Sequence, residues 1–273
     1  MAEVFLRKLK FEWLAFVSAL QLLTRLPLEA LVAQDRPEAA HHQRAQIWYP
    51  WAGLIIGLLL AMLTSFLPEQ WSVQLCGALI LIVWIGLTGS LHLDGLADAA
   101  DAWAGGMADR EKTLSIMKDP TCGPAAVVVI CLCLLLKWQL LAELLGKGAG
   151  SIELSLVLAP LAARAWLLPM LASLPYARQD AESGMAANIA REFPIKAGVT
   201  SFVAAQIFIL LFLLAAGLGL FSWIGVMAIM TLVFWSVWRA TRLRLGGYTG
   251  DVLGALVELM ELTFLVSLVV FLG

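Results

Sequence analysis

Charged side chains are scarce in this sequence. Only 14% of its 273 residues are Asp, Glu, Lys or Arg, whereas 61% are hydrophobic and the mean hydropathy is +0.88. Ordinary soluble domains are about 25% charged and about 45–50% apolar. The composition therefore excludes a soluble globular protein and predicts a polytopic membrane protein. The net charge of -2 also excludes the broadly basic surface that nucleic-acid binding requires, so no nucleic-acid partner is expected.

Several catalytic and structural motifs are absent as well. The four cysteines lack any CxxC spacing, so we expect neither a disulfide framework nor a zinc knuckle. The sequence contains no GxxxxGK[ST], HExxH or GxSxG motif, which argues against a P-loop ATPase, a zincin protease and a serine hydrolase. Glu12 and Arg25 interrupt the first apolar stretch, which lacks a small-residue cleavage site, so no cleavable signal peptide is expected.

Long apolar windows are abundant. A helix needs about 20 apolar residues to cross the hydrocarbon core of a bilayer. Charge-poor windows of about that length predict seven transmembrane helices, at 45–67, 70–93, 124–145, 153–173, 199–219, 221–239 and 251–272. The uncharged stretch 197–238 is too long for one helix, so we divide it at Gly217 and Gly219.

The positive charges predict the orientation of these helices. Most of the 18 Lys and Arg residues lie before the first span, in the 94–123 and 174–198 loops, or just before the last span, and with seven spans these regions share one side. The opposite loops carry only Lys147. Because short cytoplasmic loops retain positive charge, the N-terminus and the long loops are predicted to be cytoplasmic.

The N-terminal segment is the exception. A full crossing by residues 11–31 would place Arg7, Lys8 and Lys10 on the wrong side, so we interpret the segment as an interfacial or re-entrant helix, with an eighth span as the alternative. The predicted fold is an all-α, polytopic membrane helix bundle. It forms a single integral-membrane domain over 1–273, with residues 1–44 cytoplasmic or interfacial and 45–273 forming the transmembrane bundle.

An acidic cluster follows the second predicted span. If this region is helical, Asp94, Asp98 and Asp101 have i, i+4, i+7 spacing and share one face. Like charges so close to a membrane are costly unless a cation neutralises them. Oxygen ligands suit a hard cation such as Mg²⁺, which binds carboxylates together with substrate phosphates. The alternative is a set of solvated acids at the membrane interface, and neighbouring His92 is interpreted as an interfacial residue.

A second acidic cluster lies near the C-terminus. A glycine-rich GGYTG loop precedes a helix whose Asp251, Glu258 and Glu261 share a face, and two of these acids lie inside an apolar span. Intramembrane acids indicate a cavity, a cationic partner or a proton path. The loop could hold a phosphate with backbone N–H groups at the start of the helix. The loop residues assigned to substrate binding are Gly247, Thr249 and Gly250.

Three cations are candidate partners for these acids or for phosphate. Arg164 lies within an apolar span and needs an anion, either Glu258 or Glu261 or a substrate phosphate. Arg25 and Lys118, which precedes Asp119, are better placed for a cytoplasmic phosphate. Snorkelling of Arg25 toward lipid headgroups is its alternative role.

Four motifs carry a resemblance to a known family. LHLDGLADAADAW, IMKDPTCGPAA, GGYTGDVLGALVELMEL, and LLTRLP followed by YPWAGLIIG resemble in order and spacing the bacterial cobalamin synthase family, adenosylcobinamide-GDP ribazoletransferase. The resemblance implies a Mg²⁺-dependent enzyme of the bacterial inner membrane, with its active site facing the cytoplasm. Its implied substrates are adenosylcobinamide-GDP and α-ribazole or α-ribazole 5′-phosphate, joined with release of GMP. Family members often carry glycine after the third aspartate, and here Ala102 disfavours a tight turn at that point.

The resemblance also implies roles for the candidate residues. Asp94, Asp98 and Asp101 would hold Mg²⁺ against the diphosphate, and Asp119 or Asp251 would serve as the base or as a further metal ligand. The predicted substrate-binding residues are Arg25, Lys118, Arg164, Gly247, Thr249, Gly250 and Glu258. Membrane lipid is an implied partner, and a homo-oligomer remains an open alternative.

Three other functions remain as alternatives. A CDP-alcohol phosphotransferase needs a DxxDGxxAR pattern, which this sequence lacks. A UbiA-like prenyltransferase needs DxxxD clusters on two helices, and the second acidic cluster does not fit that spacing. A cation-coupled transporter would place its acids at the midplane, whereas the Asp94 cluster is predicted at the cytoplasmic edge.

Overall fold

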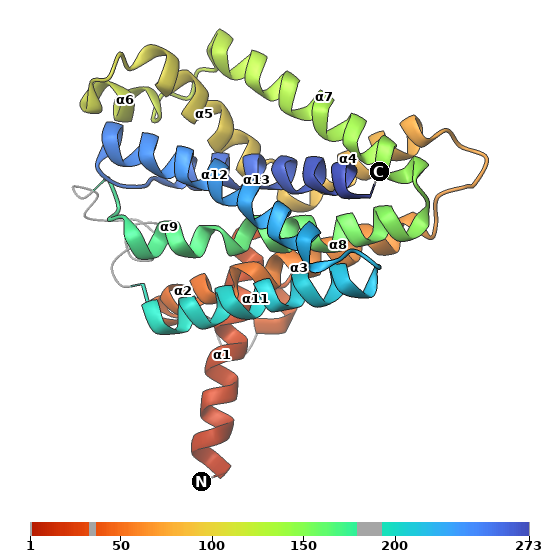
Figure 1. Cartoon of the computed structure of the whole chain (residues 1–273). Coiled ribbons are helices and arrows are strands. Elements are labelled where there is room, and N and C mark those ends of the chain that lie inside the picture. The colour runs from red at the N-terminus through yellow and green to blue at the C-terminus, as the bar shows by residue number, and fades with distance from the viewer. Residues whose placement is uncertain (1, 33–36, 179–192, 273) are drawn as a thin grey trace.

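The computed structural model describes residues 2–32, 37–178 and 193–272. In these residues the chain is almost entirely helical, with one isolated backbone pairing between Tyr176 and Tyr248 (Figure 1). The helices are α1 Ala2–Leu23, α2 Ala39–Ala45, α3 Tyr49–Thr64, α4 Val73–Thr88, α5 Leu91–Gly105, α6 Arg110–Ile116, α7 Pro124–Gly146, α8 Ala149–Ala165, α9 Leu167–Ser173, α11 Ile195–Ala215, α12 Leu220–Leu245 and α13 Gly250–Phe271. Short 3₁₀ turns occur at Glu29–Val32 and Gln46–Trp48.

The predicted membrane spans correspond to helices of suitable length and composition. Six segments of the described chain are long and apolar enough to cross a membrane, and the bent pair α4 and α5 makes a seventh if it counts as one span. The six are Ala39–Thr64, Pro124–Gly146, Ala149–Ser173, Ile195–Ala215, Leu220–Leu245 and Gly250–Phe271. The prediction of an all-α polytopic bundle with about seven spans is therefore confirmed.

The second span differs from its prediction. We expected one helix over 70–93, but α4 ends at Thr88 and α5 leaves it at an angle of 87°. Gly89 and Ser90 between them both adopt the left-handed region, with φ of 60° and 59°. Right-handed helix cannot continue through such residues. The acidic motif therefore lies on a separate helix that runs to Gly105, and Ala102 is buried within it rather than at a turn.

Helix α8 lies at the centre of the bundle. In the segment formed by α8 and α9, 89% of the 18-residue hydrophobic window is buried inside the protein. In α12, at the periphery, 11% of the corresponding window is buried. α8 packs against α3 on one side and α13 on another (Figure 1). Arg164 near the end of α8 is consequently sealed from solvent.

Helix α1 crosses the direction of the bundle helices (Figure 1). It is not among the segments with the composition of a span, in agreement with an interfacial helix rather than an eighth crossing. Glu12, which interrupts its apolar stretch, pairs with Arg44 at 2.7 Å and accepts a hydrogen bond from Trp48 Nε1 at 3.0 Å. These contacts attach α1 to the start of the first span. The exposed half before Glu12 carries Phe5 and Leu9 together with its basic residues.

Candidate active site

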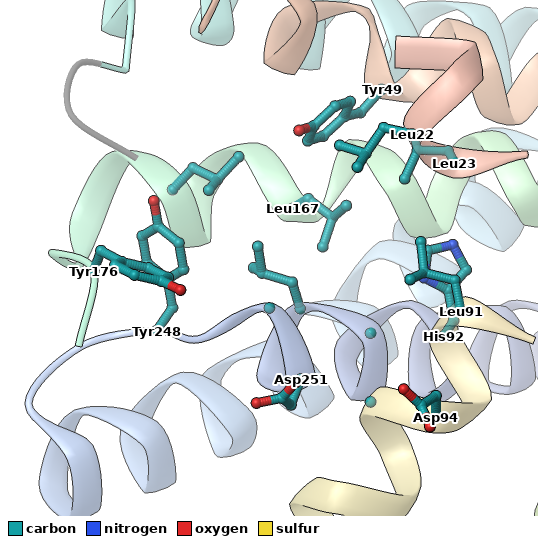
Figure 2. Close-up of a pocket in the computed structure, with 15 residues that line it drawn as sticks. Leu22, Leu23, Tyr49, Leu91, His92, Asp94, Leu167, Tyr176, Tyr248 and Asp251 are labelled. Carbon is teal, nitrogen blue, oxygen red and sulfur yellow. The ribbon is translucent and has the colours of Figure 1, made fainter. Parts of the chain in front are cut away.

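Close contact between α5 and α13 positions the acidic residues. A Cβ atom at Gly95 would lie 2.7 Å from the backbone oxygen of Asp251 and 3.2 Å from Cα of Gly254. Real Cβ atoms do not approach backbone so closely, so the crossing requires a residue without a side chain at 95. The crossing places Asp94 of α5 and Asp251 of α13 on the wall of one cavity (Figure 2).

This cavity, which we call the crossing cavity, has a volume of about 340 Å³. Its wall is mostly leucine and tyrosine, with carboxylates at one edge (Figure 2). The lining residues are Leu22, Leu23, Tyr49, Leu91, His92, Asp94, Gly95, Leu167, Leu171, Tyr176, Tyr248, Gly250, Asp251, Leu253 and Gly254. An apolar cavity with a few convergent polar groups is the usual form of a small-molecule site.

Negative charge accumulates at that edge. Asp94, Asp98 and Asp251 are close enough for their ionised carboxylates to repel one another. Arg178 Nη2 donates to Asp251 Oδ2 at 2.7 Å and offsets part of this charge. The remaining carboxylates provide the hard oxygen donors that suit a divalent cation with phosphate ligands.

A second cavity follows the acidic face of α5. It has a volume of about 350 Å³ and is lined by Asp94, Asp98 and Asp101, together with the chain at 120–122. The three aspartates therefore share a face, as their spacing predicted. Asp94 lines both this cavity and the crossing cavity.

Asp101 nevertheless has a different role from its neighbours. Its carboxylate accepts hydrogen bonds from the backbone N–H groups of Gly123 at 2.6 Å and Ala126 at 2.9 Å, at the start of α7. Carboxylates stabilise helix N-termini in this way. Within residues 2–32, 37–178 and 193–272, no three His, Cys, Asp or Glu side chains converge to hold a metal ion. Both carboxylate oxygens of Asp101 thus contribute to capping α7, and the predicted three-carboxylate Mg²⁺ site stays a prediction.

The capping role predicts a loss of stability. Asp101→Ala should lower the free energy of unfolding by about 1–2 kcal/mol, because two N–H groups of α7 lose their acceptor. Asp98→Ala is the matched control, since its carboxylate accepts no hydrogen bond from the described residues and should leave the melting temperature nearly unchanged. Thermal unfolding in detergent measures both. Equal melting temperatures for the two variants would contradict the capping role.

The 117–123 loop carries two further predicted site residues. Lys118 and Asp119 are both exposed, and neither lines the three cavities described here. Asp119 accepts hydrogen bonds from the backbone N–H and the hydroxyl of Thr121, which hold the pKa of its carboxyl below the usual range. This geometry does not support Asp119 as the base, whereas Asp251 lies at the crossing cavity.

The GGYTG loop is mainly structural. Thr249 is buried and caps α13 by accepting a hydrogen bond from Val252 N–H at 3.2 Å. Tyr248 N–H donates to Pro175 at 2.9 Å, and Gly247 packs against the same segment. Gly250 alone of the three predicted loop residues lines the crossing cavity. The expectation that Gly247 and Thr249 bind phosphate is therefore not supported by this arrangement.

Tyr248 brings a neutral hydroxyl to the crossing cavity. Burial, and to a smaller extent Tyr176, raises the pKa of Tyr248 to about 12. The phenol therefore stays protonated at neutral pH and remains a hydrogen-bond donor. The two tyrosine rings lie 5.6 Å apart at an edge-to-face angle of 65°.

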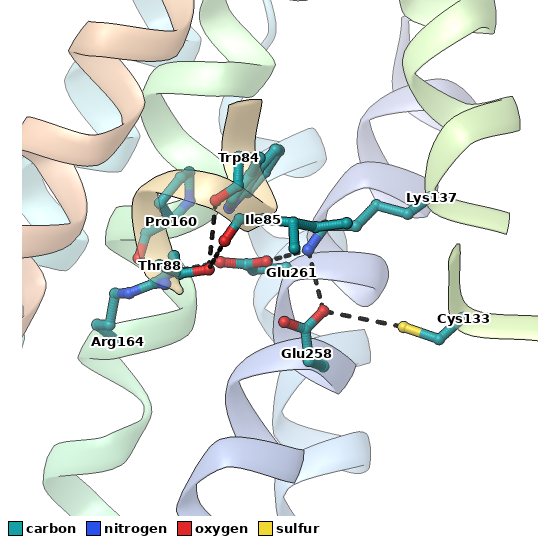
Figure 3. A network of polar contacts seen from close by, with 9 residues as sticks. All are labelled: Trp84, Ile85, Thr88, Cys133, Lys137, Pro160, Arg164, Glu258 and Glu261. Atoms are coloured by element: carbon teal, nitrogen blue, oxygen red, sulfur yellow. Dashed lines mark hydrogen bonds and ion pairs between the residues drawn. The ribbon is translucent and has the colours of Figure 1, made fainter. Parts of the chain in front are cut away.

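Arg164 and the two glutamates of α13 form a buried network with Lys137 of α7 (Figure 3). Glu261 pairs with both Arg164 and Lys137, and Lys137 Nζ lies 3.0 Å from Glu258. Lys137 also lies over the Trp84 ring, 4.3 Å from its centroid. Neither Arg164 nor Glu258 lines the three cavities, and both are paired within the protein, so their predicted role in substrate binding stays a prediction.

Arg25 lines a third cavity of about 310 Å³, between the ends of α1, α2 and α4. Its side chain is exposed and has no ion-pair partner within the described residues. The role of Arg25 in binding an anion stays a prediction.

Sequence analysis did not identify the roles of three residues that the structure connects to the predicted ones. Lys137 interrupts the apolar run 124–146 and was a detectable signal, because an intramembrane cation needs a partner. Nothing in the sequence around Arg178, apart from its charge, indicated that it pairs with Asp251. His92 was interpreted as interfacial, but it is buried, lines the crossing cavity, and its Nε2 has no partner in the described structure.

Comparison with known proteins extends over nearly the whole chain. Residues 15–269 match the family described as Cobalamin-5-phosphate synthase. Proteins named adenosylcobinamide-GDP ribazoletransferase from Pseudomonas aeruginosa and Pseudomonas putida are 43% and 42% identical to it, covering 92% and 93% of this chain and 95% and 98% of their own length. The protein of that name from Pseudomonas fluorescens is 41% identical, over 94% of this chain and 100% of its own. No solved structure matches. The match from residue 15 to residue 269 and the identity to these relatives show that the chain belongs to the cobalamin-5-phosphate synthase family.

Proposed function

We propose that this protein is a membrane transferase of the cobalamin nucleotide-loop pathway. It joins adenosylcobinamide-GDP to α-ribazole or α-ribazole 5′-phosphate and releases GMP. The family match and the names of the relatives support this activity. The structural observation that carries it is the convergence of Asp94 and Asp251 on one apolar cavity.

The reaction replaces one phosphorus–oxygen bond with another. The ribose hydroxyl of the nucleoside attacks the phosphorus atom of adenosylcobinamide-GDP that is bonded to the cobinamide. The phosphoanhydride bond between this phosphorus and GMP then breaks. The hydroxyl proton needs an acceptor, and the developing charge on the phosphate oxygens needs stabilisation. We assign proton acceptance to Asp251, whose carboxylate lies at the crossing cavity and is oriented by Arg178.

The donor set fits the Mg²⁺ that the family resemblance implies. Asp94 and Asp98 are carboxylates one turn apart on α5, and one or two carboxylates with substrate phosphates are the usual protein ligands of Mg²⁺. When bound, Mg²⁺ supplies positive charge to the diphosphate oxygens. The wall of the crossing cavity is mostly apolar, and Tyr248, which lines it, carries a hydroxyl group that can donate a hydrogen bond.

Turnover by the purified protein tests this function. The protein is incubated with Mg²⁺, adenosylcobinamide-GDP and α-ribazole, and GMP and the corrinoid product are measured together. Equal amounts of the two products are expected. Absence of GMP from a folded, monodisperse protein would overturn the proposal. Release of pyrophosphate from a prenyl diphosphate would instead indicate the UbiA-like alternative.

We also place the protein in the bacterial inner membrane with its active site facing the cytoplasm. The asymmetry of Lys and Arg supports this orientation, because the acidic helix α5 precedes the positively charged segment around α6. Membrane lipid surrounds the bundle in this proposal.

Cysteine labelling tests the orientation. In a background without the four native cysteines, Lys112→Cys should resist an impermeant maleimide added to intact spheroplasts, because α6 faces the cytoplasm. Ala149→Cys, an exposed position at the start of α8, is the matched control and should be labelled. Both sites should react after the membrane is opened. Labelling of Lys112→Cys but not Ala149→Cys in intact spheroplasts would invert the topology.

A further inference from the structure

We propose that the cavity around Arg25 binds the 5′-phosphate of the nucleoside substrate and so distinguishes α-ribazole 5′-phosphate from α-ribazole. The inference rests on the proposed function and specifies which phosphate Arg25 holds. We call this cavity the Arg25 cavity. It is lined by Ser18, Gln21, Leu22, Thr24, Arg25, His42, Ala45, Thr88 and Leu91.

The free donors of this cavity are few. Three hydroxyl groups on its wall already donate to backbone carbonyls of their own helices, namely those of Ser18, Thr24 and Thr88. The side chains left to donate to a ligand are Arg25, Gln21 and His42. Of these, the Arg25 guanidinium carries a permanent positive charge and a planar set of donors that matches phosphate oxygens.

The fold holds Arg25 in place. Its backbone N–H donates to the Leu87 carbonyl at 2.8 Å, so the chain after α1 is attached to the end of α4. The Arg25 side chain lies directly over Gly89, where a Cβ atom would come within 2.9 Å of Arg25 Cδ. Gly89 has a φ of 60°, a conformation that other residues adopt at a cost. The break between α4 and α5 therefore provides the surface on which the arginine rests.

The Arg25 cavity is separate from the acidic edge but shares a wall with the crossing cavity. Leu22 and Leu91 line both cavities, whereas Arg25 lines only one and Asp251 only the other. The phosphorus that reacts must lie where the carboxylates act, next to Asp94. Because Arg25 lines a different cavity, the phosphate that it binds is one that does not react. The 5′-phosphate of the nucleoside meets this condition, and it belongs to the same molecule as the attacking hydroxyl.

Binding of the two nucleosides, without the corrinoid substrate, tests this assignment. Isothermal titration of the purified full chain in detergent should show about ten- to a hundredfold tighter binding of α-ribazole 5′-phosphate than of α-ribazole. Arg25→Ala should reduce this ratio to within about threefold of one. Arg25→Lys, which keeps the charge but loses the planar donors, should give an intermediate ratio. Arg239→Ala is the control, because Arg239 is an exposed arginine that lines none of the three cavities, and it should keep the full ratio.

Two results would overturn the assignment. Equal affinity for the two nucleosides in the unsubstituted protein, or a ratio unchanged in Arg25→Ala, would show that Arg25 does not recognise the 5′-phosphate. If Arg25→Ala weakens adenosylcobinamide-GDP binding and leaves the nucleoside ratio intact, the anion at Arg25 is the diphosphate instead. These measurements need no turnover, so failure of the proposed transferase activity and failure of the Arg25 assignment are separate outcomes.

Discussion

Asp94→Asn and Asp98→Asn are each expected to lower kcat/KM for GMP release by at least about a hundredfold. Each substitution removes a carboxylate charge at the acidic edge with almost no change in volume. Neither carboxylate accepts a hydrogen bond in the described structure, so the melting temperature should stay close to that of the unsubstituted protein. Activity and melting temperature measured on the same samples separate loss of function from loss of fold.

The Mg²⁺ dependence of these variants distinguishes a metal ligand from a group that acts on substrate alone. Loss of one ligand should raise the Mg²⁺ concentration needed for half-maximal activity, and excess Mg²⁺ should restore part of the activity. Glu111→Gln is the matched control, since Glu111 is an exposed acid on α6 that lines none of the three cavities. Near-native activity of both Asp variants at every Mg²⁺ concentration would refute their role.

Lys137→Met should destabilise the protein by about 3–5 kcal/mol, the largest change in stability that we expect. Lys137 pairs with Glu258 and Glu261, and all three side chains are buried. Its removal leaves two carboxylates with only Arg164 to balance them. Because a buried charge without a partner is far more costly than a buried pair, the bundle should unfold at a markedly lower temperature.

A compensating change tests whether charge balance is the cause. In Lys137→Met combined with Glu258→Gln, the Arg164 and Glu261 pair remains and the network is again neutral. The double variant should recover much of the stability lost in Lys137→Met, because the contacting charges are not independent. Lys147→Met, outside the network, is the control and should change stability little. Equal destabilisation by the single and double variants would show that packing rather than charge is responsible.

Some of the site was accessible from local spacing. The i, i+4, i+7 pattern of Asp94, Asp98 and Asp101 predicted a shared face, and α5 has that face, because helical periodicity is a property of the local chain. The same pattern could not show that Asp101 caps α7. That depends on a segment 22 residues further along the chain returning to α5.

The partner of Arg164 illustrates the same limit. Sequence analysis left Glu258, Glu261 and a substrate phosphate as alternatives, because a buried cation needs an anion but does not specify which. The packing of α7, α8 and α13 selected Glu261 and added Lys137, which the prediction had overlooked. A residue expected to bind substrate thus became part of the bundle's interior.

By itself the sequence determined the class of protein, the approximate positions of the helices and the family. The length of apolar segments, the asymmetry of charge and the spacing of motifs are all properties of the linear sequence. The 87° break after α4, the meeting of Asp94 with Asp251, and the anchoring of Arg25 on Gly89 were decided only by the tertiary structure. Each of these depends on contacts between segments far apart in sequence. The packing of whole helices determines such contacts, and a local residue pattern does not specify which distant residue will be the partner.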